Sequence, residues 1–285
     1  MKIHNTTTYF LDHYVPTEVF LRSYYEKFPE SFKEYFLYHC RNPDQKIPAA
    51  IKKYPVKFED MRQSSQNIER LIHQTVDAYR QKYGITFTED VHIIIGAFGS
   101  NAFTHRQIIP EITFCLEQLS SKEANLQVII AHEFGHALHN AISAQEGMDW
   151  EKLDWGHPYT WLLQEGCATY FSRQIVKADE AVYFSYDENG ENWLQFVKDN
   201  KQAVLSAFIQ DMEMSSDIEI FHEWFSINGG QRFGYTRLAY FIAYVVFENL
   251  ARKYGDVKAV TLWNKGDFHA YVEHELLELQ HANLD

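Results

Sequence analysis

The stretch NLQVIIAHEFGHALHNAI, residues Asn125–Ile142, places two histidines and a glutamate inside a segment that is otherwise apolar. Burying ionisable groups costs free energy unless hydrogen bonds or a metal ion compensate them. His132 and His136 are four residues apart, so on a helix they lie on one face, one turn apart. Two imidazoles directed at one point are two of the ligands that a tetrahedral zinc ion needs. The stretch therefore predicts a metal-binding helix.

Glu133 follows the first histidine directly, which places it beside a metal held by the two imidazoles but not on it. A carboxylate in this position can accept a proton from an attacking water and pass it to the leaving group. The alternative interpretation is a pair of core histidines that hydrogen-bond to backbone or carboxylate groups. The pattern favours Glu133 as a general base, because a purely structural site has no use for one.

Zinc in a hydrolase usually takes three protein ligands, so the sequence must supply a third. His139 lies near the same face as His132, but a single helix cannot easily direct three side chains at one ion. Asp154 and His157, in a polar loop downstream, are further alternatives. The favoured candidate is Glu165 in LLQEGCATYF, because it stands in an amphipathic helical segment beside Gly166, where small residues indicate close packing with another helix.

Composition sets the class of protein. The chain has 285 residues, of which 46% are hydrophobic and 16% aromatic, so it can bury a substantial core. Its formal net charge is −13, which disfavours nucleic acid and anionic membrane surfaces as partners. Three cysteines without a paired spacing, no secretory signal and no bilayer-spanning apolar stretch predict a cytoplasmic protein.

Residues 1–85 are expected to form helical pieces interrupted by prolines, namely Pro16, Pro29, Pro43, Pro48 and Pro55. The clearest piece is residues 58–84, where apolar residues recur at helical spacing and Gly84 supplies a C-terminal stop. Residues 90–99 and 110–119 have the β-branched content and the alternation typical of strands.

The remainder of the chain is expected to be mainly helical. Asn125 is a plausible N-cap for the helix that carries the two histidines, and residues 159–178 and 234–255 predict two further helices. The fold class is therefore α+β: a small mixed sheet packed on the histidine-bearing helix, with mostly helical flanking regions. We expect an N-terminal helical region, residues 1–85, and a core with a C-terminal helical subdomain, residues 86–285, forming one compact unit.

In its motifs the chain resembles the gluzincin class of zinc metallopeptidases, in which HExxH lies on one helix and a glutamate ligand on the next. The matching residues are His132–His136 and the segment that begins at Glu165. The long gap between the two motifs is more similar to poorly characterised bacterial predicted zinc-dependent proteases of the peptidase MA superfamily. Their GYxxGY-like helix corresponds here to residues 234–240, followed by Tyr254–Gly255, and the resemblance covers about residues 85–255.

The resemblance implies a zincin-like fold with one Zn²⁺ ion, held by His132, His136 and Glu165, and with Glu133 as general base. It also implies a sheet edge that binds an extended substrate by backbone pairing. The edge would be supplied by residues 108–119, IIPEITFCLEQL, or by residues 96–104, GAFGSNAFT.

The chain differs from two groups of enzymes in that class at positions that bear on its function. Thermolysin-like enzymes carry an aspartate four residues after the glutamate ligand, and the residue here is Thr169. The M1 aminopeptidases carry a GxMEN strand whose glutamate binds the substrate's amino group; Glu117 is only a distant analogue, so aminopeptidase activity is not implied.

The predicted function is hydrolysis of peptide bonds in a peptide or protein by a metal-activated water. A tyrosine hydroxyl commonly donates to the oxyanion in such sites, and Tyr235 is the first candidate and Tyr240 the second. Two alternatives stay open: a non-catalytic zinc or peptide-binding protein, and a zinc hydrolase of a non-peptide amide or ester.

Overall fold

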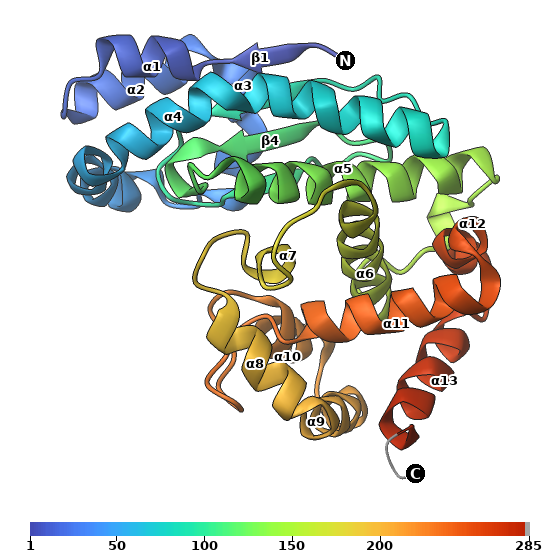
Figure 1. The fold of residues 1–285 in the computed structure, drawn as a ribbon. Coiled ribbons are helices and arrows are strands. Elements are labelled where there is room, and N and C mark those ends of the chain that lie inside the picture. Colours follow the sequence, from blue (N-terminus) through green and yellow to red (C-terminus); the bar gives the residue numbers. More distant parts are fainter. Residues whose placement is uncertain (283–285) are drawn as a thin grey trace. The chain divides into compact units, whose positions relative to one another are not determined.

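The computed structural model describes residues 1–282 as an α+β protein with one four-stranded sheet (Figure 1). The chain forms two compact units, Met1–Ala137 and Leu138–Asp285. The division at residue 85 expected from the sequence stays a prediction. None of the helices in residues 1–282 combines the length and the apolar character that crossing a bilayer requires.

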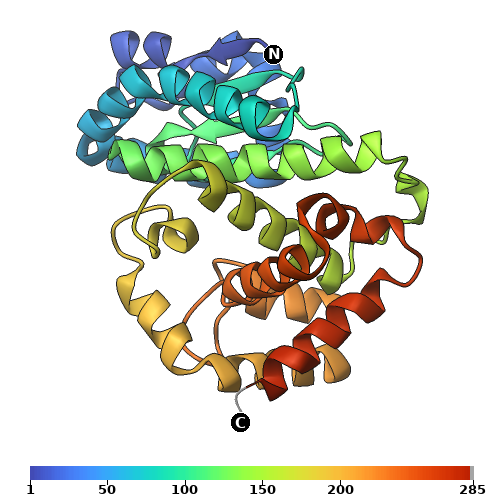
Figure 2. The same cartoon turned by 45° about the vertical axis from the view of Figure 1, so that its right-hand side comes forward.

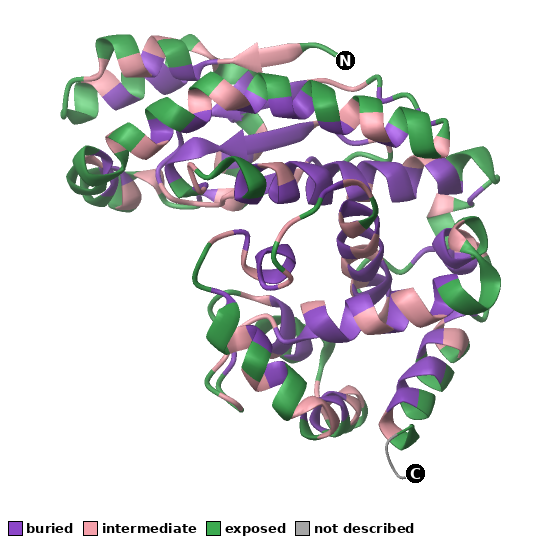
Figure 3. Cartoon of the chain, in the orientation of Figure 1, coloured by how far each residue is buried: buried purple, intermediate pink, exposed green. Residues whose placement is uncertain are grey.

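The sheet belongs to the first unit. Its strands are β1 (Ile3–Asn5), β2 (Val91–Ile94), β3 (Ala102–Thr104) and β4 (Ile112–Cys115), in the order β1-β2-β4-β3. Strands β1, β2 and β4 run parallel to one another, and β3 pairs antiparallel with β4. Every residue of β2 and β4 is buried (Figure 3), as is typical of inner strands covered on both faces.

Both predicted strands exist, but the alternation in residues 110–119 does not separate a buried from an exposed face. All four residues of β4 are buried, and the chain then turns into the 3₁₀ helix η2 (Leu116–Gln118). Because β4 lies between β2 and β3, residues 108–119 are not a sheet edge, and that expectation is wrong. Residues 96–104 contain β3, which is an edge strand; β1, the opposite edge, was not predicted.

The N-terminal region is helical, as expected. Its helices are α1 (Thr7–His13), α2 (Glu18–Lys27), α3 (Pro29–Glu34), the π-helix η1 (Tyr35–His39) and α4 (Pro43–Tyr83). Gly84 ends α4 with a left-handed φ of 71°, as its position predicts. Pro48 and Pro55, however, lie inside α4 and do not interrupt it.

Packing explains why α4 continues through its prolines. A proline inside a helix removes a hydrogen bond and costs about 3 kcal/mol. Ile47 and Tyr54, each next to a proline, are essentially inaccessible to solvent, and the Tyr54 hydroxyl donates to the carbonyl oxygen of Gly96 at 2.5 Å. Burial of this apolar face offsets the cost of the prolines. Rules based on the local sequence do not include this tertiary contribution.

The histidine-bearing helix is α5 (Glu123–Gln145), whose first fifteen residues belong to the first unit. It begins two residues before Asn125, so the expected N-cap is wrong; the Asn125 side-chain amide instead donates to Ser120 Oγ at 3.2 Å. Helix α4 runs alongside the sheet (Figure 1), and its Tyr79 hydroxyl donates to the Ala131 carbonyl oxygen of α5 at 2.8 Å.

The second unit is helical, as predicted. Its elements are η3 (Trp150–Lys152), α6 (Pro158–Ile175), α7 (Val182–Ser185), α8 (Glu191–Asp199), α9 (Lys201–Met214), α10 (Asp217–Ile220), η4 (Phe221–Phe225), α11 (Ala239–Tyr254), α12 (Asp256–Val260), η5 (Thr261–Asn264) and α13 (Phe268–His281). Helix α11 starts five residues later than expected and ends before Gly255, as expected.

Helices α6 and α11 pack at very close range, as Figures 1 and 2 both show. A Cβ atom built on Gly166 would lie only 2.2 Å from the carbonyl oxygen of Ala243. Glycine is therefore required where the two helix backbones meet, which confirms the close packing predicted from the residues beside Glu165.

Candidate metal centre

The HEFGH segment lies on α5, as the sequence predicts. His132 is 3% exposed, Glu133 is 8% exposed and His136 is half-buried. The two imidazole ring centroids are 4.8 Å apart, with the ring planes at 89°. This arrangement follows directly from the i, i+4 spacing, which places both rings over the same face of the helix.

Apolar side chains surround this part of α5. Phe134 packs edge-on against Phe87 with ring centroids 4.9 Å apart, and Ile129 and Ile130 are buried. A low-dielectric surrounding strengthens any charge interaction made by the histidines and Glu133. The packing also fixes the helix itself, so the two imidazoles start from a rigid support.

Glu165 lies on α6, in the second unit, and is half-buried. The three residues that follow it, Gly166, Cys167 and Ala168, are buried against α11 or the surrounding core. Thr169, at the place where thermolysin-like enzymes carry an aspartate, is fully buried. The position of the Glu165 carboxylate along α6 is thus set by the close α6–α11 contact, and its role as a metal ligand stays a prediction.

The other candidates for a third ligand have structural partners. His139 stacks on Trp263 with ring centroids 3.7 Å apart, and its Nε2 donates to the Val260 carbonyl oxygen at 3.0 Å. His157 is the N-cap of α6, where its Nδ1 accepts from the Tyr159 backbone N–H at 3.1 Å. Asp154 Oδ1 accepts from the Gly156 N–H at 2.9 Å. These contacts explain the three residues without a metal ion.

The two tyrosines proposed as oxyanion donors both belong to the second unit. Tyr235 lies in the loop before α11, and its ring stacks on Phe196 at 4.5 Å. Tyr240 lies in the first turn of α11, with the Arg237 guanidinium 5.5 Å from its ring centroid. The role of each hydroxyl stays a prediction.

Glu117 is fully buried and holds the loop that follows β2. Its carboxylate accepts backbone N–H groups from Gly96 at 2.8 Å and from Phe98 at 3.1 Å, and burial raises its pKa to about 7. The Tyr35 hydroxyl accepts the intervening Ala97 N–H at 2.6 Å. Glu117 therefore shapes this loop and is not accessible for binding a substrate's amino group.

Another group of three side chains that could hold a metal ion lies within the first unit. It comprises His92, His105 and Glu111, which sequence reasoning missed because no motif links them. The sequence indicates this cluster only by placing His92 within one apolar strand segment and Glu111 beside another.

Comparison with known proteins gives one match. The family model described as "Putative zinc dependent peptidase (DUF5700)" matches residues 18–256, a span that includes the HEFGH segment and Glu165. No curated protein matches the chain, and no solved structure does. Because the match covers more than half of the sequence, the chain belongs to the family that this model describes, DUF5700.

Proposed function

We propose that this chain is a gluzincin-type zinc peptidase whose single catalytic Zn²⁺ is held by His132, His136 and Glu165. The observation that carries the proposal is the HEFGH segment, buried on α5 with both imidazoles on one face, in a member of a family described as zinc dependent peptidases. The substrate is a peptide bond in a peptide or protein.

The donor set fits zinc. Two imidazole nitrogens and one carboxylate oxygen are three protein ligands of the kinds that catalytic zinc takes, and they leave one coordination position open. Two neutral ligands and one anionic ligand leave the site with a net positive charge. When bound, the ion acidifies water and polarises a carbonyl group.

The protein groups carry the proton transfers. Glu133 takes the proton from water as it attacks the peptide carbonyl, and returns it to the amine that leaves. Its low exposure, 8%, keeps bulk water from competing for that proton. The Tyr235 hydroxyl, or that of Tyr240, donates to the developing oxyanion.

The test separates metal binding from catalysis. Glu133→Gln should keep one zinc per chain at the α5 site and abolish hydrolysis of unfolded casein and of a peptide library. Glu146→Gln, which changes an exposed glutamate just beyond the end of α5, is the matched control and should keep both. A Glu133→Gln protein that cleaves at the normal rate would remove the general base from the proposal.

A second pair of variants tests the third ligand. Glu165→Ala should lower the affinity for that zinc and the rate of hydrolysis together, because it removes one of three ligands. Asp154→Asn, at an exposed candidate in the polar loop, should leave both unchanged. Zinc content by mass spectrometry, followed through a chelator titration, gives the readout. Full zinc affinity in Glu165→Ala would refute the ligand set.

A further inference from the structure

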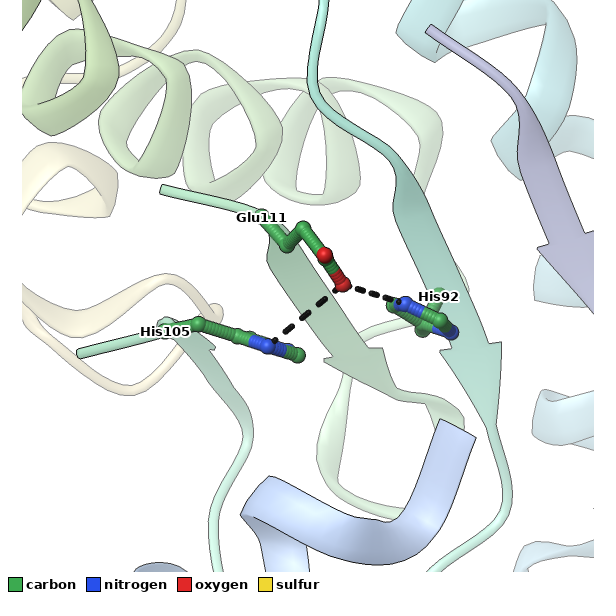
Figure 4. A group of neighbouring side chains, drawn as sticks. All are labelled: His92, His105 and Glu111. Carbon is green, nitrogen blue, oxygen red and sulfur yellow. Dashed lines mark hydrogen bonds and ion pairs between the residues drawn. The ribbon is translucent and has the colours of Figure 1, made fainter. Parts of the chain in front are cut away.

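A second histidine cluster lies on the sheet of the first unit. His92 is in β2, His105 directly follows β3, and Glu111 directly precedes β4 (Figure 4). Glu111 Oε2 lies 2.9 Å from His92 Nε2 and 3.7 Å from His105 Nδ1. The three candidate ligand atoms lie within 4.8 Å of one another. Three segments of the chain thus direct three metal-ligand groups at one point.

The outer nitrogen of each imidazole faces a hydroxyl group. His92 Nδ1 lies 3.0 Å from Ser31 Oγ, and His105 Nε2 lies 2.7 Å from Thr113 Oγ1. His92 Nε2 donates to the Glu111 carboxylate in this structure, so binding a metal ion would require the His92 proton to sit on Nδ1, where Ser31 Oγ can accept it. Metal-binding histidines are generally fixed in this way, by a hydrogen bond from the nitrogen that does not bind the metal.

Both imidazole side chains are largely shielded from solvent. His92 is 3% exposed and His105 is 9% exposed. The Glu111 side chain is 29% exposed, which gives an ion a path from solvent.

The backbone holds the ligands in place before any ion arrives. The His105 N–H donates to the Glu111 carbonyl oxygen at 2.8 Å and closes the loop between them. Strand pairing sets His92 opposite Thr113, the residue whose hydroxyl faces His105. A site supported by paired strands loses little conformational freedom when it binds an ion.

We propose that His92, His105 and Glu111 bind a divalent transition-metal ion such as Zn²⁺, in a structural site that joins β2 to the β3–β4 hairpin. Two imidazoles and a carboxylate suit borderline ions of the zinc type and not Mg²⁺ or Ca²⁺, which prefer oxygen ligands. Solvent supplies the remaining coordination. This inference is independent of the proposed peptidase site.

The experiment uses the full chain with the α5 histidines removed, His132→Ala/His136→Ala, so that only the sheet site can bind zinc tightly. After incubation with Zn²⁺ and removal of excess ion, this variant should retain one zinc per chain. Adding His105→Ala should reduce the content to background. Adding His73→Ala, which changes an exposed histidine on α4, should leave one zinc bound.

Glu111→Gln provides a second test, because it removes the charge but preserves the volume and an oxygen that faces His92. It should weaken Zn²⁺ binding at least tenfold and abolish the visible absorption of a Co²⁺-loaded protein, while circular dichroism shows the fold retained. Absence of bound zinc in the folded His132→Ala/His136→Ala protein would overturn the proposal. So would a zinc ion that persists in both His105→Ala and Glu111→Gln, since the cluster would then be only a hydrogen-bonded network.

Discussion

The contact between α6 and α11 predicts that the substitution Gly166→Ala lowers the stability of the protein. The new Cβ would lie 2.2 Å from the Ala243 carbonyl oxygen and 2.8 Å from Phe247 Cβ, whereas ordinary contact begins at 3.4 Å. The oxygen belongs to a helix backbone, so it cannot rotate away, and the two helices must separate. The shortfall of 1.2 Å, from 3.4 − 2.2, sets the scale of that movement.

Two effects of opposite sign determine the free energy of unfolding. Alanine stabilises a helix interior by about 1 kcal/mol relative to glycine. Overpacking typically costs about 1–3 kcal/mol, and a clash with a backbone carbonyl belongs at or above the upper end. We therefore expect Gly166→Ala to destabilise the protein by about 2 kcal/mol, and to weaken zinc binding because Glu165 moves with α6.

Urea unfolding followed by circular dichroism measures the first effect, and a chelator titration measures the second. Gly266→Ala is the matched control, because a Cβ at that glycine meets no atom within 4 Å. It should change the urea midpoint little. A Gly166→Ala protein that is as stable as the unmodified chain would refute the close backbone contact.

Two further predictions concern buried carboxylates. Burial raises the pKa of Glu117 to about 7 in the folded state, from an ordinary value of 4.5, so the folded state binds this proton more tightly than the unfolded state does. The free energy of unfolding should therefore fall as the pH rises from about 4.5 to 7, by up to about 3 kcal/mol. The stability difference between the unmodified chain and Glu117→Gln should shift by this amount across that range; a difference independent of pH would contradict the shifted pKa. Lys253 Nζ lies 2.6 Å and 2.9 Å from the two carboxylate oxygens of Glu275, whose side chain is 2% exposed. Lys253→Met should therefore cost about 1–3 kcal/mol in urea unfolding, and adding Glu275→Gln should recover most of it, because the uncompensated buried charge is then gone.

Features encoded by neighbouring residues were predictable from the sequence. The α5 face follows from a four-residue spacing, and the stop of α4 at Gly84 follows from the freedom of glycine at positive φ. The close packing of the Glu165 helix against another helix could also be predicted, because Gly166 interrupts a run of larger residues. Each of these depends on contacts within one or two helical turns, or on one residue's own conformational limits.

Features that depend on distant parts of the chain were not predictable. Pro48 predicts a break, and only the burial of the α4 face against the rest of the unit overrides it. The three residues of β1 carry no recognisable pattern, and they form a strand because β2 supplies the partner. Glu117 lies within the segment predicted as one alternating strand, yet the chain turns after Cys115, and the Glu117 carboxylate is buried and bonded to the loop of Gly96 and Phe98.

The two histidine groups show the same distinction at the level of function. His132 and His136 are brought together by helix geometry alone, so any sequence that forms α5 also forms the pair. His92 and His105 face one carboxylate only because β2 and β3 both pair with β4, an arrangement that the intervening residues do not reveal. Of the two proposed zinc sites, therefore, the histidine pair on α5 could be predicted from the sequence, whereas the cluster on the sheet depends on the order of the strands.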